Sequence, residues 1–254
     1  MAIRILFIGN SYTYFNEMPL MVEAMATVDG TNAQVESSVA GGYSLAQHAD
    51  PCDPVGAVTL AKLQEPWDFV ILQEQSRRPA IPRERDEQMR PTVGRLNDMV
   101  TALGGKTILY MTWGRRHGDP ETGYSTYDEM QDAIAQAYAD IGAQYDTGVA
   151  PVGLAFRRAL DMRPDIELWD ADNSHPSLQG SLLAAYVIYE AITGMSPLEA
   201  TYCSAVPPAD DAVLREAAHQ AAIARQCMQP ASQGSRRNCV MVPAHSGLSA
   251  CPRV

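Results

Sequence analysis

The sequence predicts an α/β fold in which a parallel five-stranded sheet lies between two layers of helices. Two observations favour this fold. Short apolar runs of strand length recur along the chain, and segments with helical periodicity lie between them. Because right-handed crossovers place each connecting helix against the sheet, this alternation is typical of a three-layer α/β/α domain. In such open sheets, functional residues lie just after the strands, at their carboxyl ends.

Five segments have the composition of strands. The clearest are residues 3–8 (IRILFI), 67–73 (WDFVILQ) and 106–112 (KTILYMT), whose largely apolar character is expected of strands buried on both faces. Residues 33–39 (AQVESSV) and 144–149 (QYDTGV) carry the same signal more weakly. We therefore expect one sheet built from these segments.

Helical periodicity marks the segments between the strands, because an amphipathic helix buries residues three and four apart. Three inward faces are predicted: Leu20, Met21, Ala24, Met25 and Val28; Met89, Val93, Leu96, Val100 and Leu103; and Met130, Ile134, Ala137 and Ile141. A longer helix is predicted over 177–193, with Gly194 as its C-cap and an inward face of Leu178, Leu182, Ala185, Tyr189 and Ile192.

The chain of 254 residues is long enough to bury a substantial core, and we expect a single domain over residues 1–228. Residues 210–228 have the composition of an Ala-rich helix. Residues 229–254 mix Pro, Gly, Ser and Arg without periodicity, which predicts an irregular, poorly ordered C-terminal tail.

The acidic composition narrows the classes of partner. The net charge of -11 argues against nucleic acid or an anionic membrane as the main partner, because both require clustered Lys and Arg. No apolar run approaches the roughly 20 residues that span a bilayer. The first residues, MAIRILFIGN, have the pattern of a strand rather than of a signal peptide, so a cytoplasmic location is expected. The sequence leaves the oligomeric state open.

The five cysteines form no C-x-x-C pair, so neither a zinc ribbon nor a thioredoxin-like redox motif is indicated. The chain also lacks a G-x-G-x-x-G segment after a strand and a Walker A sequence, which argues against nucleotide binding. We expect no metal and no organic cofactor.

Small and polar residues follow the predicted strands. The first strand is followed by GNS at 9–11, the second by AGGYS at 40–44, and the third overlaps LQEQS at 72–76. A fourth segment, DADNSHPS at 170–177, precedes the long helix. These four segments are expected to converge at the carboxyl edge of the sheet.

Together these segments contain the groups that acyl transfer requires. A serine hydroxyl becomes a good nucleophile when an imidazole takes its proton, and a carboxylate fixes the orientation of that imidazole. Ser11, His175 and Asp172 could fill these three roles. The oxyanion that develops on the substrate needs donors aimed at it, and the N–H groups of Ser11 and Gly42 are candidates.

A side-chain amide would complete the oxyanion hole. Gln73 and Gln75 both lie at the carboxyl end of the third predicted strand, and either could supply it.

In this pattern the chain resembles the SGNH hydrolases, also called the GDSL lipase/esterase superfamily, over roughly residues 3–195. That superfamily has a Gly-Asp-Ser block after the first strand, an oxyanion glycine after the second, an oxyanion asparagine after the third and a D-x-x-H dyad near the C-terminus. The matching positions are Ser11, Gly42, the QEQS segment and Asp172 with His175. The resemblance implies a flavodoxin-like three-layer fold and an esterase, with acetylated carbohydrates among its possible substrates.

The sequence departs from the family pattern at two places. Asn10 replaces the usual Asp beside the nucleophile, a change we expect to be tolerated because that position makes mainly local hydrogen bonds. LQEQS replaces the Gly-x-Asn-Asp block. By position Gln75 matches the family's asparagine and is slightly favoured, whereas Gln73 lies closer to the end of the strand.

The candidate residues also have structural interpretations. Ser11 could only cap the helix that follows it, and His175 with Asp172 could be ordinary polar residues before a helix. Asp170 competes with Asp172 as the partner of His175, but its spacing of five residues folds back onto the ring less easily. The joint occurrence of these residues in the family's order favours the catalytic interpretation.

Three further residues could line the site. His48 follows the glycine turn and His117 lies in a charged loop, and we expect surface positions for both. Trp113 follows the fourth strand, where either a pocket wall or a packed core position is possible.

Two other functions are compatible with this fold class. The segment NSYTYFN after the first strand is similar to the hydroxyl-rich phosphate loop of flavodoxin-like FMN-binding modules. A non-catalytic carbohydrate-binding protein could also have this fold.

Overall fold

A computed structural model describes residues 2–228 of the chain, with side chains up to residue 224. The predicted tail at 229–254 lies outside the described residues. Five parallel strands form one sheet in the order β2-β1-β3-β4-β5. The strands are β1 (Ile3–Gly9), β2 (Ala33–Val39), β3 (Phe69–Leu72), β4 (Lys106–Tyr110) and β5 (Gly148–Ala150). This confirms the predicted three-layer, flavodoxin-like α/β fold.

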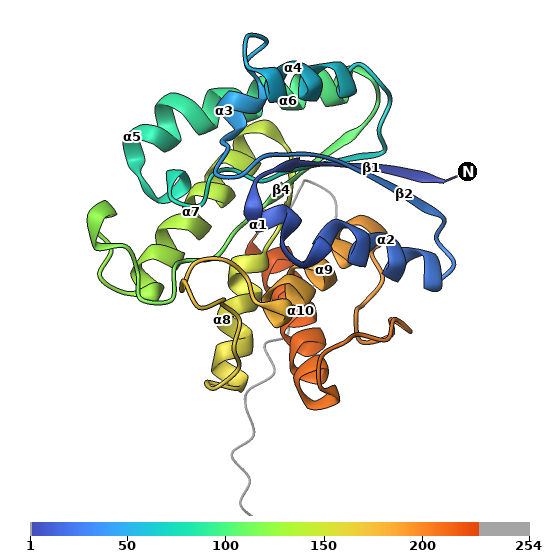
Figure 1. Cartoon of the computed structure of the whole chain (residues 1–254), viewed down its shortest axis with the longest axis vertical. Coiled ribbons are helices and arrows are strands. Elements are labelled where there is room, and N and C mark those ends of the chain that lie inside the picture. The colour runs from blue at the N-terminus through green and yellow to red at the C-terminus, as the bar shows by residue number, and fades with distance from the viewer. Residues whose placement is uncertain (1, 229–254) are drawn as a thin grey trace, which may run out of the picture.

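Helices cover both faces of the sheet (Figure 1). One layer contains α2 (Met18–Val28), α8 (Val152–Met162), α9 (Leu178–Thr193) and α10 (Pro208–Met228). The other contains α3 (Leu45–His48), α4 (Pro54–Lys62), α6 (Arg90–Ala102) and α7 (Tyr127–Tyr145). Shorter helical elements are α1 (Ser11–Tyr14), α5 (Pro82–Glu84), η1 (Phe15–Glu17), η2 (Arg78–Ala80), η3 (Arg85–Met89) and η4 (Pro120–Thr122).

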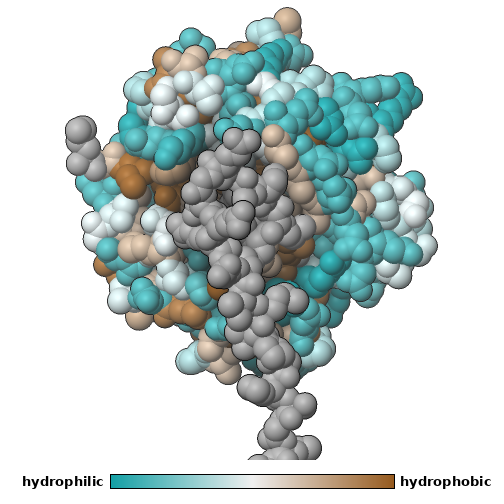
Figure 2. Space-filling model, turned by 180° about the vertical axis from the view of Figure 1, so that it is seen from behind, coloured by the Kyte–Doolittle hydropathy of each residue, from teal (hydrophilic) through white to brown (hydrophobic). Residues whose placement is uncertain are grey.

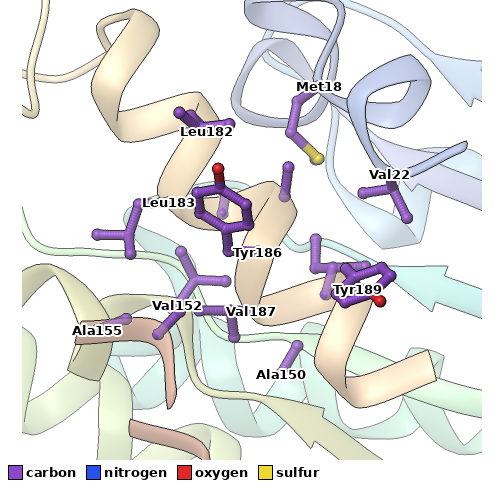
Figure 3. Close-up of a cluster of buried hydrophobic side chains, with 14 of the residues drawn as sticks. Met18, Val22, Ala150, Val152, Ala155, Leu182, Leu183, Tyr186, Val187 and Tyr189 are labelled. Atoms are coloured by element: carbon purple, nitrogen blue, oxygen red, sulfur yellow. The ribbon is translucent and has the colours of Figure 1, made fainter. Parts of the chain in front are cut away.

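The strands divide the core into two clusters, because successive side chains of a strand point to opposite faces. In β1, Ile5 and Phe7 belong to the cluster between the sheet and helices α2 and α9. Leu6 and Ile8 belong to the cluster between the sheet and helices α6 and α7. Figure 3 shows the first cluster, where side chains of α9 such as Tyr186 lie among residues of α2, α8 and β5. The carboxyl end of β1 is therefore held from both sides.

Three predicted strands are shorter in the structure. β3 ends at Leu72 and β4 at Tyr110, so Gln73 lies beyond the strand rather than within it. The predicted strand at 144–149 overlaps α7, which continues to Tyr145 and ends at Asp146 in the left-handed conformation, with φ of 51°. The long helix predicted over 177–193 is confirmed, and Gly194 caps it with φ of 72°.

Helices α3, α4 and α8 have no counterpart among the predicted helices. For α8 the signal is present, since Val152, Ala155, Phe156 and Ala159 are buried at positions i, i+3, i+4 and i+7.

Four residues predicted to face inward are exposed instead: Leu20, Val28, Leu103 and Leu178. In α2 the buried face is formed by Met18, Val22 and Met25. Apolar residues occur on nearly every side of this helix, so composition alone does not select the buried face.

The rear surface of the molecule is largely hydrophilic, with apolar patches in several separate places (Figure 2). Within residues 2–228, no helix combines the length and the apolar character needed to cross a bilayer.

Candidate active site

Ser11 lies at the start of the short helix α1, directly beyond the carboxyl end of β1. The Oδ1 atom of Asn10 caps this helix by accepting a hydrogen bond of 3.0 Å from the N–H of Tyr12. Gly9 allows the tight packing here, because a Cβ atom at this position would lie 2.5 Å from both Gln73 Oε1 and Thr13 Oγ1. We call residues 9–13 the serine turn.

The structure brings Ser11 together with His175, although the two are far apart in the sequence. His175 Nε2 lies 2.8 Å from Ser11 Oγ, and His175 Nδ1 is paired with the carboxylate of Asp172. Because a carboxylate only accepts hydrogen bonds, Nδ1 carries the proton of the neutral imidazole and Nε2 is left to accept from the hydroxyl. This is the tautomer that a general base for Ser11 requires.

A tight turn before α9 presents the imidazole and the carboxylate together. Asp172 Oδ1 accepts hydrogen bonds of 2.9 Å from the N–H groups of Ser174 and His175. Burial opposes ionisation, but the hydrogen bonds from His175 and from these N–H groups outweigh it and lower the pKa of Asp172. The competing residue, Asp170, points its Oδ1 to the N–H of Ala171 instead. Of the two acidic residues, Asp172 is the one that contacts the ring.

Aromatic side chains surround the imidazole of His175. The Phe15 ring stacks on it with a centroid distance of 4.4 Å, and the Tyr12 ring meets it edge-on at 5.6 Å. Tyr12 in turn stacks on Trp113, which is fully buried and donates from Nε1 to the carbonyl oxygen of Ser174 at 3.1 Å. Trp113 is therefore a core residue that supports the turn carrying His175.

The candidate backbone donors of an oxyanion hole are the N–H groups of Ser11 and Gly42. Within the described residues, the N–H groups of Ser11 and Gly42 donate no hydrogen bond to protein atoms. Gly42 lies exposed in the segment after β2 with φ of 72°, a conformation that favours glycine. The strand order places this segment, residues 40–45, on one side of the serine turn and residues 73–76 on the other. We call them the glycine loop and the glutamine segment.

The two candidate glutamines differ in their surroundings. Gln73 is fully buried, and its Oε1 accepts from the N–H of Asn10 at 2.8 Å and from the hydroxyl of Thr13 at 2.9 Å. Its Nε2 donates to the carbonyl oxygen of Glu74. Gln75 is half-buried and accepts from the N–H of Arg77 at 2.9 Å, which leaves its NH₂ group without a protein acceptor among the described residues. Both ends of the Gln73 amide are therefore occupied by hydrogen bonds, whereas only the oxygen of the Gln75 amide is.

His48 is fully buried, so the expectation of a surface position is wrong for it, whereas His117 is exposed as expected. His48 Nε2 lies 2.9 Å from the carbonyl oxygen of Gly9, which can only accept, so Nε2 carries the proton. Its Nδ1 lies 2.9 Å from the hydroxyl oxygen of Thr59. Burial lowers the pKa of His48, which keeps the ring neutral in this arrangement. The ring thus anchors the end of β1 that carries the serine turn.

Sequence reasoning did not name Phe15 or Asn16, and it placed His48 at the surface. Phe15 stacks on His175, His48 binds Gly9, and Asn16 donates from Nδ2 to Ser181 Oγ at 2.9 Å, which joins η1 to α9. Asn16 adopts φ of 53°, an uncommon conformation for a residue with a side chain, and this was invisible in the composition. Within the described residues, no group of three or more side chains is arranged to hold a metal ion.

Comparison with known proteins identifies the family. A solved structure from Slackia heliotrinireducens, assigned to the SGNH hydrolases, is 36% identical to this chain, with a TM-score of 0.67. The match covers 76% of this chain and 100% of that one. The chain belongs to the SGNH hydrolase superfamily.

Other solved structures share the fold of this SGNH hydrolase at lower identity. A DUF4886 family protein from Bacteroides uniformis is 18% identical, with a TM-score of 0.76 over 88% of this chain and 95% of that one. An acetylxylan esterase from Geobacillus stearothermophilus is 15% identical, with a TM-score of 0.55 over 76% of this chain and 96% of that one. No protein-family profile and no curated protein matches the chain. The family membership makes the protein a hydrolase of the SGNH type.

Proposed function

We propose that this SGNH hydrolase is a serine esterase that cleaves carboxylic esters through a covalent acyl-enzyme. The contact that carries the proposal is the 2.8 Å approach of His175 Nε2 to Ser11 Oγ, with Asp172 on the other ring nitrogen. Ser11 Oγ attacks the ester carbonyl carbon as its proton passes to His175. The carbon–oxygen bond to the alcohol then breaks, and the imidazolium gives its proton to the departing alcohol. Water, activated by the same imidazole, hydrolyses the acyl-enzyme and releases the acid.

The oxyanion of the tetrahedral intermediate is held by the N–H groups of Ser11 and Gly42 and by the amide of Gln75. The free state of these donors supports this role, because preorganised donors cost no reorganisation when charge develops. Removing one such donor typically lowers kcat by about 10²- to 10³-fold.

Small acyl esters, including acetylated carbohydrates, are the first substrates to examine. The acetylxylan esterase among the structural neighbours motivates this choice, and its low identity leaves the acyl group and the alcohol to experiment. A panel of short-chain p-nitrophenyl esters and acetylated sugars would identify them.

The FMN-binding alternative receives less support from the site. A phosphate loop needs free hydroxyl and N–H donors, but Tyr12 Oη lies 2.7 Å from Ser174 Oγ and Thr13 Oγ1 donates to Gln73. Flavin absorbance in the purified protein, or saturable binding of FMN, would favour that alternative. Binding of a glycan without turnover would favour the non-catalytic carbohydrate-binding protein.

Labelling and turnover together test the esterase proposal. The wild-type protein should hydrolyse p-nitrophenyl acetate and react at Ser11 with a fluorophosphonate, and Ser11→Ala should lose both reactions. Ser125→Ala, at an exposed serine before α7, is the matched control and should retain both. Undiminished turnover in Ser11→Ala would reject the proposal.

A further inference from the structure

Glu74 is a fully buried acidic residue that the proposed mechanism does not use. It lies between Gln73 and Gln75, directly beyond the end of β3. A buried carboxyl group costs free energy unless it is hydrogen-bonded, so a residue of this kind in a catalytic region requires an explanation. The inference that follows rests on the proposed esterase function.

One oxygen of Glu74 joins two segments of the site. Glu74 Oε1 accepts a hydrogen bond of 2.7 Å from the N–H of Gln75 and one of 3.2 Å from the N–H of Leu45. Leu45 ends the glycine loop and begins α3, three residues after Gly42. Among the described residues, no other hydrogen bond connects the glycine loop with the glutamine segment.

The remaining pairs of segments are joined as well. Asn10 Nδ2 donates to the carbonyl oxygen of Tyr43 at 2.8 Å, which links the serine turn to the glycine loop. Gln73 Oε1 accepts from the N–H of Asn10 at 2.8 Å, which links the glutamine segment to the serine turn. The bond from Leu45 to Glu74 closes a triangle of three connections among the segments that carry the oxyanion donors.

We propose that Glu74 is a positioning residue that holds the Gly42 N–H and the Gln75 amide at the spacing needed to bind one oxyanion. It acts through the backbone of both segments and does not touch the substrate. An oxyanion hole depends on donors fixed in place before the reaction, so loosening one segment lowers kcat while substrate binding is largely retained.

The choice of test variants depends on whether the role of Glu74 requires a charged carboxylate. Its second oxygen, Oε2, is buried and has no hydrogen-bond partner among the described residues. Burial raises the pKa of Glu74 to about 7, against the opposing effects of the Gln75 and Leu45 amides and of Arg78 in η2. The nearby Glu84 in α5 adds to the rise, and Tyr138 in α7 also faces the group.

Both protonation states keep an acceptor oxygen for the two N–H groups, so the connection does not require a charge. Glu74→Gln has the same carbonyl acceptor and should preserve the connection. Glu74→Leu is similar in size but has no acceptor, and it should break the connection.

Steady-state kinetics with p-nitrophenyl acetate test the prediction. Glu74→Leu should lower kcat by about 10- to 100-fold, as expected for misplaced donors, with KM changed less than about threefold. Glu74→Gln should restore kcat to within about threefold of wild type. Glu190→Leu, which alters a largely buried carboxylate of α9 paired with His219, is the control and should leave kcat unchanged.

A second pair of variants removes the connection from its other end and serves if Glu74→Leu does not fold. Leu45 is the first residue of α3, where proline is tolerated, and the preceding Ser44 has extended backbone with φ of -103°. Leu45→Pro removes the N–H that Glu74 accepts, whereas Leu45→Ala removes only side-chain volume. Leu45→Pro should therefore have the lower kcat of the two.

Amide hydrogen exchange supplies a readout that is independent of turnover. The Leu45 N–H should exchange faster in Glu74→Leu than in wild type and should remain protected in Glu74→Gln. A wild-type kcat in Glu74→Leu, or an equal loss in Glu74→Gln, would overturn the proposal. Absence of turnover in the wild-type protein would instead reject the esterase function, and with it the role of the triangle in catalysis.

Discussion

The side-chain amide of Asn10 donates a hydrogen bond of 2.8 Å to the carbonyl oxygen of Tyr43 in the glycine loop. Its Oδ1 atom also accepts from the N–H of Tyr12 in the serine turn. The position thus uses both the donor and the acceptor of the amide. The expectation that this position makes mainly local hydrogen bonds therefore describes the contact with Tyr12 but not the contact with Tyr43. A carboxylate at this position could not donate to the Tyr43 carbonyl.

Asn10→Asp is therefore expected to lower both the stability and the activity of the protein, although it restores the usual residue of the family. A carboxylate would face the Tyr43 carbonyl, which is half-buried and would lose its donor. A fully buried acceptor left unsatisfied costs about 1–3 kcal/mol, so the cost here should be at the lower end of that range. We expect lower kcat together with a lower free energy of unfolding in urea. Asn97→Asp is the control, because Asn97 Nδ2 also donates to a tyrosine carbonyl, that of Tyr145 at 3.3 Å, but away from the site. If both variants keep wild-type kcat, the Asn10 contact has no catalytic consequence.

Asp172→Asn should lower kcat by about 10²- to 10⁴-fold, because an amide can donate to Nδ1 and favour the wrong tautomer of His175. Asp170→Asn changes the same group on the same turn without a contact to the ring, and its kcat should remain close to that of wild type. Comparison of kcat on p-nitrophenyl acetate distinguishes the two carboxylates. Equal losses would show that the turn, rather than the hydrogen bond between Asp172 and His175, supports activity.

Substitution of the two glutamines should have different effects: loss of Gln73 should lower stability, and loss of Gln75 should lower kcat. Gln73→Ala removes the acceptor of Asn10 N–H and Thr13 Oγ1, so it should lower the free energy of unfolding by about 1–3 kcal/mol. Gln75→Ala should leave stability nearly unchanged and lower kcat by about 10²- to 10³-fold. Urea unfolding and kcat measured on both variants test this. A stable Gln75→Ala variant with full activity would exclude Gln75 from the oxyanion hole.

The fold, and the convergence of Ser11, Asp172 and His175 in one place, were predictable because their signals are local. The apolar strands and the helical faces of α6, α7 and α9 are periodic in the sequence. Ser11 follows the first strand, and the spacing of Asp172 and His175 fits a single turn. Helix α8 has an equally clear i, i+3, i+4, i+7 pattern of buried residues. It was therefore predictable as well, although it is absent from the predicted helices.

The contacts that support the site could not be predicted in the same way, since they join residues distant in the sequence. His48 binds the carbonyl oxygen of Gly9, and Glu74 binds the N–H of Leu45. A single sequence contains no information about those distances. The acidic residue in LQEQS, directly after a buried strand, was the one visible sign that an unusual environment exists there.

His48 should make the protein less stable in mild acid. Burial lowers the pKa of the folded-state imidazole below its ordinary value of 6.5, so the unfolded chain binds the proton first as the pH falls. The contribution of His48 to the free energy of unfolding is complete above its pKa in the unfolded chain, and it decreases as the pH falls below that pKa. His48→Gln can keep a donor for the Gly9 carbonyl and does not titrate. Between pH 8 and pH 5, wild type should lose more free energy of unfolding than this variant does, whereas His117→Gln, at an exposed histidine, should behave like wild type.

Glu74 should have the opposite effect on the pH dependence of stability: its contribution should decrease as the pH rises. Its pKa is raised from 4.5 to about 7 in the folded protein, so the unfolded chain releases the proton first as the pH rises. The contribution of Glu74 is therefore complete below the unfolded-state pKa and is lost as the pH rises through the folded-state value. Glu74→Gln removes this titration, and relative to wild type it should gain up to about 3 kcal/mol between pH 4 and pH 8.

Urea unfolding of wild type, Glu74→Gln and His48→Gln over this pH range measures both effects. The difference between wild type and Glu74→Gln should change mainly between about pH 4.5 and 7, and should favour the variant more strongly toward higher pH. The difference between wild type and His48→Gln should change below pH 6.5, and should favour that variant more strongly toward lower pH. Because the two variants share all remaining ionisable groups with wild type, opposite slopes can arise only from the mutated residues. A pH-independent difference for Glu74→Gln would mean that the buried carboxyl group titrates as it does in the unfolded chain.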